Sequence, residues 1–187
     1  MARGPRGPLE PGLYHITARG NRRAPIFVLD RDRVSFLGQL GPVARAHEWE
    51  CRGYCLMTNH YHLLLETRTG ELSTGMKKLN GTHALRFNKD HGFRGHLFEE
   101  RFHHEAVRDE WHLYNVIRYL ARNPVEAGLC EEPADWRWGS FAAVVGRTRP
   151  PDFLDIAWTL RLFDSDDVAA RQRLLRLVVT ESEVSLA

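Results

Sequence analysis

Two histidines, His60 and His62, stand two residues apart in the stretch TNHYHLLL. Successive side chains of a β-strand point to opposite faces, so both imidazoles would share one face while Tyr61, Leu63 and Leu65 occupy the other. Two imidazoles held in this way can chelate one divalent ion, and the apolar face would anchor the strand in the core. Taken alone, such a pair is more often two polar residues on a solvated sheet face, so it predicts a metal site only together with other features.

A second set of reactive residues lies on a predicted helix over 109–123. Asp109 is a good N-cap for this helix, and Pro124 is expected to end it. The buried stripe is expected to consist of apolar residues at helical spacing, namely Leu113, Ile117 and Leu120.

Tyr119 and Asn123 share one flank of that helix, about 40° apart in projection, with His112 between them. Tyr114 projects to the opposite flank, roughly 140° from Tyr119. The amide oxygen of Asn123 can complete a metal site, and the phenol of Tyr119 can attack a group that the metal polarises. The structural alternative is a tyrosine at the core boundary and an asparagine that caps the helix before proline.

Basic and aromatic side chains suited to nucleic acid accompany these residues. Cations neutralise phosphates, and aromatic faces stack on unpaired bases. The predicted DNA-binding residues are Arg19, Arg22, Arg23, Arg86, Lys89, Arg94, Arg101 and Phe102. For some of them, a solvated basic face over core phenylalanines is an equally good explanation.

The chain has 187 residues, which favours one domain with an appendage over two full domains. The contents of 43% hydrophobic and 27% charged residues are typical of a protein with a buried core. No apolar run approaches the length of a membrane span, and the N-terminal MARGPRGPLEPG lacks the apolar stretch of a secretory signal. The three cysteines exclude a disulfide framework, so we expect a reduced, cytoplasmic protein with no membrane partner.

The net charge of +2 conceals two asymmetries. Only three of the 26 basic residues are lysines, and arginine binds phosphate with two parallel hydrogen bonds, although a GC-rich genome gives the same bias. Residues 150–187 hold seven acidic and four basic residues, which concentrates positive charge in residues 1–149. The first part of the chain is therefore expected to face a polyanion.

Hydrophobic patterning predicts the elements that position these residues. Alternation indicates strands over 13–19, 49–54 and 59–66, the last two pairing as a hairpin, and a short strand near 102–107. The first strand has a polar face formed by His15, Thr17 and Arg19. One helix is predicted over 31–48, with a kink at Gly41-Pro42. A second helix would begin after a cap at Ser73 or Thr74, with one face formed by Met76, Leu79, His83 and Phe87. A third helix is predicted over 166–180. Residues 124–146 are expected to be irregular.

These elements divide the chain into three parts. Residues 1–12, rich in glycine and proline, are expected to be a flexible N-terminus. Residues 13–148 would form the catalytic domain. An Arg-Pro-Pro sequence at 149–151 predicts the start of a C-terminal helical extension over 149–187.

Five ordered blocks make the sequence similar to a known family. They are YHITARGNRRAPIF, YCLMTNHYHLLLE, MKKLNGTHALRFN, GHLFEERFH and RYLARNPVEAGL, the last followed by DWRWGSF. Over about Leu13 to Phe141 the chain resembles the REP-associated tyrosine transposases, a branch of the single-domain HUH transposases. One position departs from the pattern, because relatives commonly carry a tyrosine where this chain has His83; packing or DNA contact is expected there.

The resemblance implies an α+β fold of the HUH/ferredoxin-like kind, with an antiparallel sheet of four or five strands and helices packed on one face. It implies a divalent metal, magnesium or manganese, held by His60, His62 and Asn123, and Tyr119 as nucleophile. The implied activity is cleavage and rejoining of single-stranded, hairpin-bearing DNA through a 5′-phosphotyrosine intermediate, by a nucleoid-associated monomer or homodimer.

Two other functions remain open on the sequence. One is a domesticated protein that binds hairpin DNA without transposition. The other is a metal-dependent nuclease that uses activated water, with a structural Tyr119.

Overall fold

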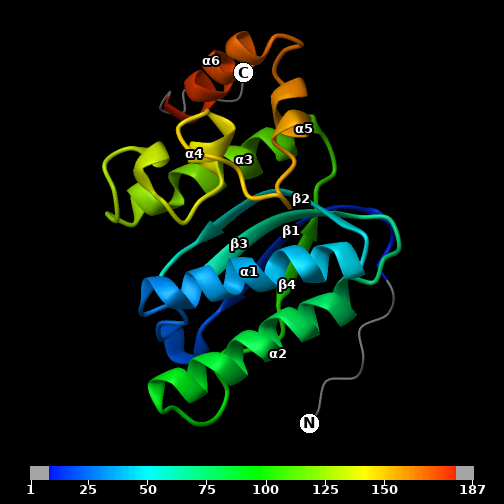
Figure 1. Ribbon diagram of the computed structural model, residues 1–187. Coiled ribbons are helices and arrows are strands. Elements are labelled where there is room, and N and C mark those ends of the chain that lie inside the picture. The colour runs from blue at the N-terminus through cyan, green and yellow to red at the C-terminus, as the bar shows by residue number, and fades with distance from the viewer. Residues whose placement is uncertain (1–8, 180–187) are drawn as a thin grey trace.

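The computed structural model describes residues 9–179 and contains a four-stranded antiparallel sheet in the order β2-β3-β1-β4 (Figure 1). The strands are β1 (Gly12–Arg19), β2 (Trp49–Leu56), β3 (His60–Thr67) and β4 (His103–Ala106). All four predicted strands are confirmed to within two residues, including the hairpin of β2 and β3. The α+β class predicted from the sequence is also confirmed.

The two faces of β3 have different surroundings. Tyr61, Leu63 and Leu65 are buried in a core that they share with α1 (Asp30–Ala46) and α2 (Leu72–His91). On the other face, Leu64 is buried in a second core against α3 (Glu110–Glu126). The strand is thus apolar on one face along its length, and its second face carries His60 and His62 beside Leu64.

The first helix layer differs from the sequence prediction in two details. α1 runs through Pro42 as one helix, because Leu40, Val43 and Ala44 are buried on both sides of the proline and hold it against the sheet. α2 begins at Leu72 rather than after a cap at Ser73 or Thr74, since Leu72 is itself fully buried. The face of α2 predicted from spacing is confirmed, and His83 packs within it.

The prediction that the helices lie on one face of the sheet holds for α1 and α2 only. α3 covers β2 and β3 from the other face, together with η2 (Pro133–Asp135) and α4 (Phe141–Val144). α3 also continues to Glu126, past Pro124, which is buried and does not end the helix. The predicted cap is confirmed, because the Asp109 side chain accepts a hydrogen bond from the backbone N–H of His112.

The C-terminal segment contributes to the second core. α5 (Ile156–Arg161) and α6 (Asp167–Val179) bury Leu160, Leu174 and Val178 beside α3. Arg52 of β2 forms ion pairs with Glu66 and Asp155, and its guanidinium lies 4.8 Å from the ring centroid of Trp158. Packing is therefore continuous across the boundary expected at residue 149. Figure 1 shows these helices grouped with α3, on the side of the sheet away from α2.

The ends of the chain lie partly outside the described residues. Residues 1–8 of the expected flexible N-terminus and residue 180 of the last predicted helix belong to those parts. Leu9 packs against the first core, and the backbone oxygen of Glu10 accepts a hydrogen bond from the Tyr14 hydroxyl. Between residues 9 and 179, none of the helices combines the length and apolar character needed to span a bilayer.

Two glycines of α2 provide a test of the first core. A Cβ atom on Gly75 would lie 2.3 Å from the Trp49 ring, whereas a Cβ on Gly81 would meet nothing within 4 Å. We expect Gly75→Ala to lower the free energy of unfolding by about 1–3 kcal/mol through overpacking. Gly81→Ala should raise it by about 0.5–1 kcal/mol, because alanine favours helix. Urea denaturation measures both, and equal effects would contradict the packing described here.

Candidate functional site

The two histidines of β3 lie together, as their spacing predicts. Their ring centroids are 4.9 Å apart and the rings are perpendicular. In the pairing of β3 with β1, His60 is opposite Arg19 and His62 is opposite Thr17. Because β3 lies between two other strands, both imidazoles project from the interior of the sheet rather than from an edge.

His62 is buried, and its two ring nitrogens have different surroundings. The Nδ1 atom lies 3.0 Å from Nε2 of His15 on β1, and the two rings are stacked. The Nε2 atom is buried and has no hydrogen-bond partner among the described residues. A buried imidazole nitrogen without a partner is costly unless a ligand takes its lone pair.

Hydrogen bonds fix the orientation and tautomer of His60. The Asn59 amide donates from Nδ2 to the backbone oxygen of Arg23 at 3.0 Å, which leaves Asn59 Oδ1 facing His60 Nδ1 at 2.7 Å. Since Oδ1 can only accept, the proton of His60 is on Nδ1, and Nε2 carries the lone pair. The Asn123 side chain of α3 also forms a hydrogen bond with His60.

Tyr119 reaches the same place from α3. Its ring is edge-on to His62, with centroids 5.0 Å apart, and 42% of the residue is exposed. Tyr114 points elsewhere, since its hydroxyl donates to the backbone oxygen of Leu162 at 3.2 Å and its ring packs on Phe163. Of the two tyrosines, only Tyr119 touches the histidines, as the helical projection predicts.

His15, His60, His62 and Tyr119 line an open pocket of about 350 Å³ between β1, β3, β4 and α3. Arg19 and Arg101 contribute positive charge to its wall. The wall also contains three carboxylates, those of Glu99, Glu100 and Glu105. The pocket thus combines two imidazoles and a phenol with charges of both signs.

Burial keeps the imidazoles neutral. It lowers the pKa of His60 to about 4, with Arg19 acting in the same direction, and the bond to Asn123 opposes the shift. Burial likewise lowers the pKa of His15 to about 4 and holds that of His62 well below the ordinary value. Neutral imidazole is the form that binds metal ions, so these rings are ready for coordination at neutral pH.

Comparison with known proteins assigns the family. The family model described as "Transposase IS200 like" matches residues 11–123, which include both histidines and the tyrosine. The chain belongs to the IS200-like transposase family. This confirms the prediction, made from the sequence blocks, of a DNA transposase of the HUH type.

Two relatives are similar over most of their length. A REP-associated tyrosine transposase of Haemophilus influenzae is 26% identical over 148 residues, which cover 70% of this chain and 80% of that protein. A solved REP-associated tyrosine transposase, bound to a REP hairpin, has a TM-score of 0.64 and 20% identity, covering 84% of this chain and 91% of the other. The second likeness supports the fold.

The other predicted DNA-binding residues are spread over the molecule. Arg22 and Arg23 are exposed in η1 (Asn21–Arg23). Asn59 bonds both to the backbone oxygen of Arg23 and to His60, so this turn is linked to the site. Exposed positions on α2 and in the loop after it hold Arg86, Lys89 and Arg94, away from the pocket. Phe102 is buried in the first core, so it offers no open ring face for stacking.

The departure at His83 is explained by packing. Its ring is buried among core aromatics, and Nε2 lies 2.9 Å from the backbone oxygen of Ile26. An N–H at Nε2 donates to that oxygen, so this histidine satisfies a loop carbonyl and does not enter the pocket.

Sequence reasoning missed several residues of the site, among them His15, Asn59 and Glu105. A signal existed for His15, because it shares the polar face of the first strand with Arg19. The polar face by itself could not place His15 in the site, because His15 comes next to His62 only through the register in which β1 pairs with β3. Glu105 required the further knowledge that β4 pairs with β1 on its other edge.

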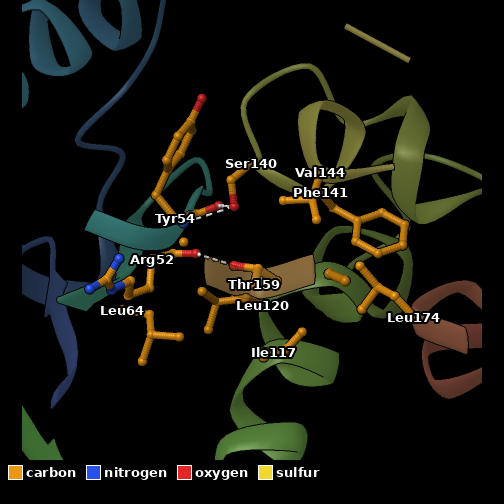
Figure 2. Close-up of a pocket in the computed structure, with 12 residues that line it drawn as sticks. Arg52, Tyr54, Leu64, Ile117, Leu120, Ser140, Phe141, Val144, Thr159 and Leu174 are labelled. Atoms are coloured by element: carbon orange, nitrogen blue, oxygen red, sulfur yellow. Dashed lines mark hydrogen bonds between the residues drawn. The ribbon is translucent and has the colours of Figure 1, made fainter. Parts of the chain in front are cut away.

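A second cavity, shown in Figure 2, lies against a different side of α3. Its lining is mainly apolar, and the hydroxyls of Ser140 and Thr159 already have backbone partners. Ser140 bonds to the oxygen of Tyr54 at 3.2 Å, and Thr159 to that of Arg52 at 3.3 Å. Because these two hydroxyls are satisfied and the rest of the lining is mainly apolar, we interpret this cavity as a packing feature of the second core.

The lowered pKa values predict an acid-dependent loss of stability. A histidine whose folded pKa lies below the unfolded value of about 6.5 stabilises the fold fully above pH 6.5, and this contribution is lost as the pH falls towards 4. We expect the unfolding free energy of the metal-free protein to be lower at pH 4.5 than at pH 7, by urea denaturation. His60→Gln should show a smaller decrease, and an unchanged decrease would mean that His60 is not buried as described.

Proposed function

We propose that this transposase is metal-dependent and cleaves and rejoins single-stranded, hairpin-bearing DNA through a covalent 5′-phosphotyrosine. The observation that carries the proposal is the convergence of His60, His62 and Tyr119 from two distant segments on one pocket, with Asn123 hydrogen-bonded to His60. The similar proteins described above add support, since both are tyrosine transposases and one was solved with a hairpin.

The residues fit a divalent ion. His62 Nε2 has no partner, Asn123 bonds to His60 and would exchange that bond for the ion, and the pocket wall has one more carboxylate than guanidinium groups. Magnesium or manganese bound there would polarise the scissile phosphate and offset its developing charge.

The chain's own residues perform the other parts of the reaction. The Tyr119 oxygen attacks the phosphorus and loses its proton, while the bond from phosphorus to the 3′ oxygen breaks and that oxygen gains a proton. One phosphodiester is exchanged for another, so the step is reversible and the free 3′-hydroxyl of a second strand can reverse it. Arg19 and Arg101 are placed to hold flanking phosphates.

A plain nuclease remains the second candidate, and Tyr119 distinguishes the two. Its partial exposure next to His62 favours the nucleophile, because a tyrosine with a structural role would be engaged as Tyr114 is. A DNA substrate would place the protein at the nucleoid. The exposed Arg22, Arg23, Arg86, Lys89 and Arg94 are proposed to contact DNA outside the pocket.

The two tyrosines form a matched pair for testing the nucleophile. Tyr119→Phe removes the attacking oxygen and should abolish the covalent adduct with labelled single-stranded hairpin DNA and manganese, seen on a denaturing gel. Tyr114→Phe should retain the adduct. Product formation without any adduct in the wild-type protein would favour the nuclease, and an adduct in Tyr119→Phe would reject the assigned nucleophile.

The metal ligands are tested by binding and cleavage together. His60→Ala and His62→Ala should each lower Mn²⁺ affinity and abolish divalent-dependent cleavage, because each removes one of three ligands. Hairpin binding, measured by a mobility shift without metal, should survive. His96→Ala serves as control, since this exposed histidine lies outside the pocket. Cleavage by His60→Ala at the wild-type rate would contradict the metal site.

A further inference from the structure

The contact between His15 and His62 has a consequence for the metal site. His15 Nε2 lies 3.0 Å from His62 Nδ1, and the stacked rings have centroids 5.1 Å apart. The His15 ring is also edge-on to Tyr119, at 6.0 Å. His15 therefore touches both a proposed ligand and the proposed nucleophile, although it is no ligand in the set given above.

The bond between two neutral imidazoles has only two possible directions. If His15 donates from Nε2, the proton of His62 lies on its own Nε2, and that atom has no lone pair for a metal. If His62 donates from Nδ1, its Nε2 carries a lone pair into the pocket. Only the second arrangement permits coordination, because a ring nitrogen that carries hydrogen cannot ligate.

We propose that His15 is a positioning residue of the metal site, which accepts the Nδ1–H of His62 and thereby directs the Nε2 lone pair of His62 towards the ion. The inference rests on the proposed metal dependence. It assigns to His15 the role that Asn59 has at His60, where an oxygen acceptor at 2.7 Å fixes the same tautomer. Each of the two imidazole ligands then has its own acceptor behind it.

The surroundings of His15 agree with this direction. When His15 accepts at Nε2, its own proton must lie on Nδ1. Glu105, whose carboxylate can only accept hydrogen bonds, is directly opposite His15 in the pairing of β1 with β4. The strands β4, β1 and β3 thus place Glu105, His15 and His62 on neighbouring positions of one sheet face.

The hydrogen bond can be detected in the wild-type, metal-free protein. Nitrogen-15 NMR distinguishes a protonated from an unprotonated ring nitrogen, and a coupling across the hydrogen bond identifies its partners. We expect His62 to be protonated at Nδ1 and coupled to an unprotonated Nε2 of His15. A His62 ring protonated at Nε2 would overturn the proposal without involving metal affinity or cleavage.

Two variants test the role at the metal. His15→Gln keeps an acceptor, the amide oxygen, near the position of Nε2, whereas His15→Leu fills the space without one. We expect His15→Leu to weaken Mn²⁺ binding by about 10- to 100-fold, which is typical of losing the partner behind a ligand, and His15→Gln to restore affinity towards that of the wild type. Titration calorimetry measures this, with thermal unfolding as the check on folding.

The outcomes separate the inference from the proposed function. Wild-type affinity in His15→Leu, with His62 still protonated at Nδ1, would reject the positioning role and leave the metal site intact. A wild-type protein that binds no Mn²⁺ would reject the proposed metal dependence, and the NMR result on the hydrogen bond would still stand by itself. Equal weakening in both variants would show that His15 acts by filling space, and would also overturn the proposal.

Discussion

The alternation of side chains along β3 is the constraint on which the site depends. Tyr61, Leu63 and Leu65 are buried beneath α1 and α2, so the register of this strand cannot slip by one residue without removing all three from the first core. The same alternation places His60 and His62 on the opposite face. The position of the site is therefore fixed by packing on the other face of the sheet, which does not involve the side chains of the site.

The second core explains how a helix distant in sequence is held against that face. α3 buries an apolar stripe against Leu64 and against residues of α5 and α6, while Tyr119 and Asn123 occupy the flank beside the stripe. The C-terminal helices thus support the helix that carries the proposed nucleophile. Arg122, between those two residues, donates to the backbone oxygen of Val178, which ties the flank directly to α6.

The same burial that holds the site together also sets its electrostatics. Desolvation keeps His15, His60 and His62 neutral. Each neutral ring has one N–H and one nitrogen lone pair, and these must match the donors and acceptors of its partners. In the proposed arrangement, Asn59 and His15 accept hydrogen bonds from the two proposed ligands, whose lone pairs face the pocket. The same burial therefore lowers the stability of the fold in acid and keeps the imidazole lone pairs unprotonated at neutral pH.

The sequence by itself determined the elements and the principal residues. Period-two and helical spacing located the strands, the buried stripe of α3 and the flank shared by Tyr119 and Asn123, because these depend on backbone geometry within one segment. Local rules failed at Pro42 and Pro124, where burial outweighs the lost hydrogen bond, and for the placement of α3 on the second face. Only the tertiary structure decided that His15 and Glu105 adjoin the site, since strand order and register arise from contacts between segments far apart in the chain.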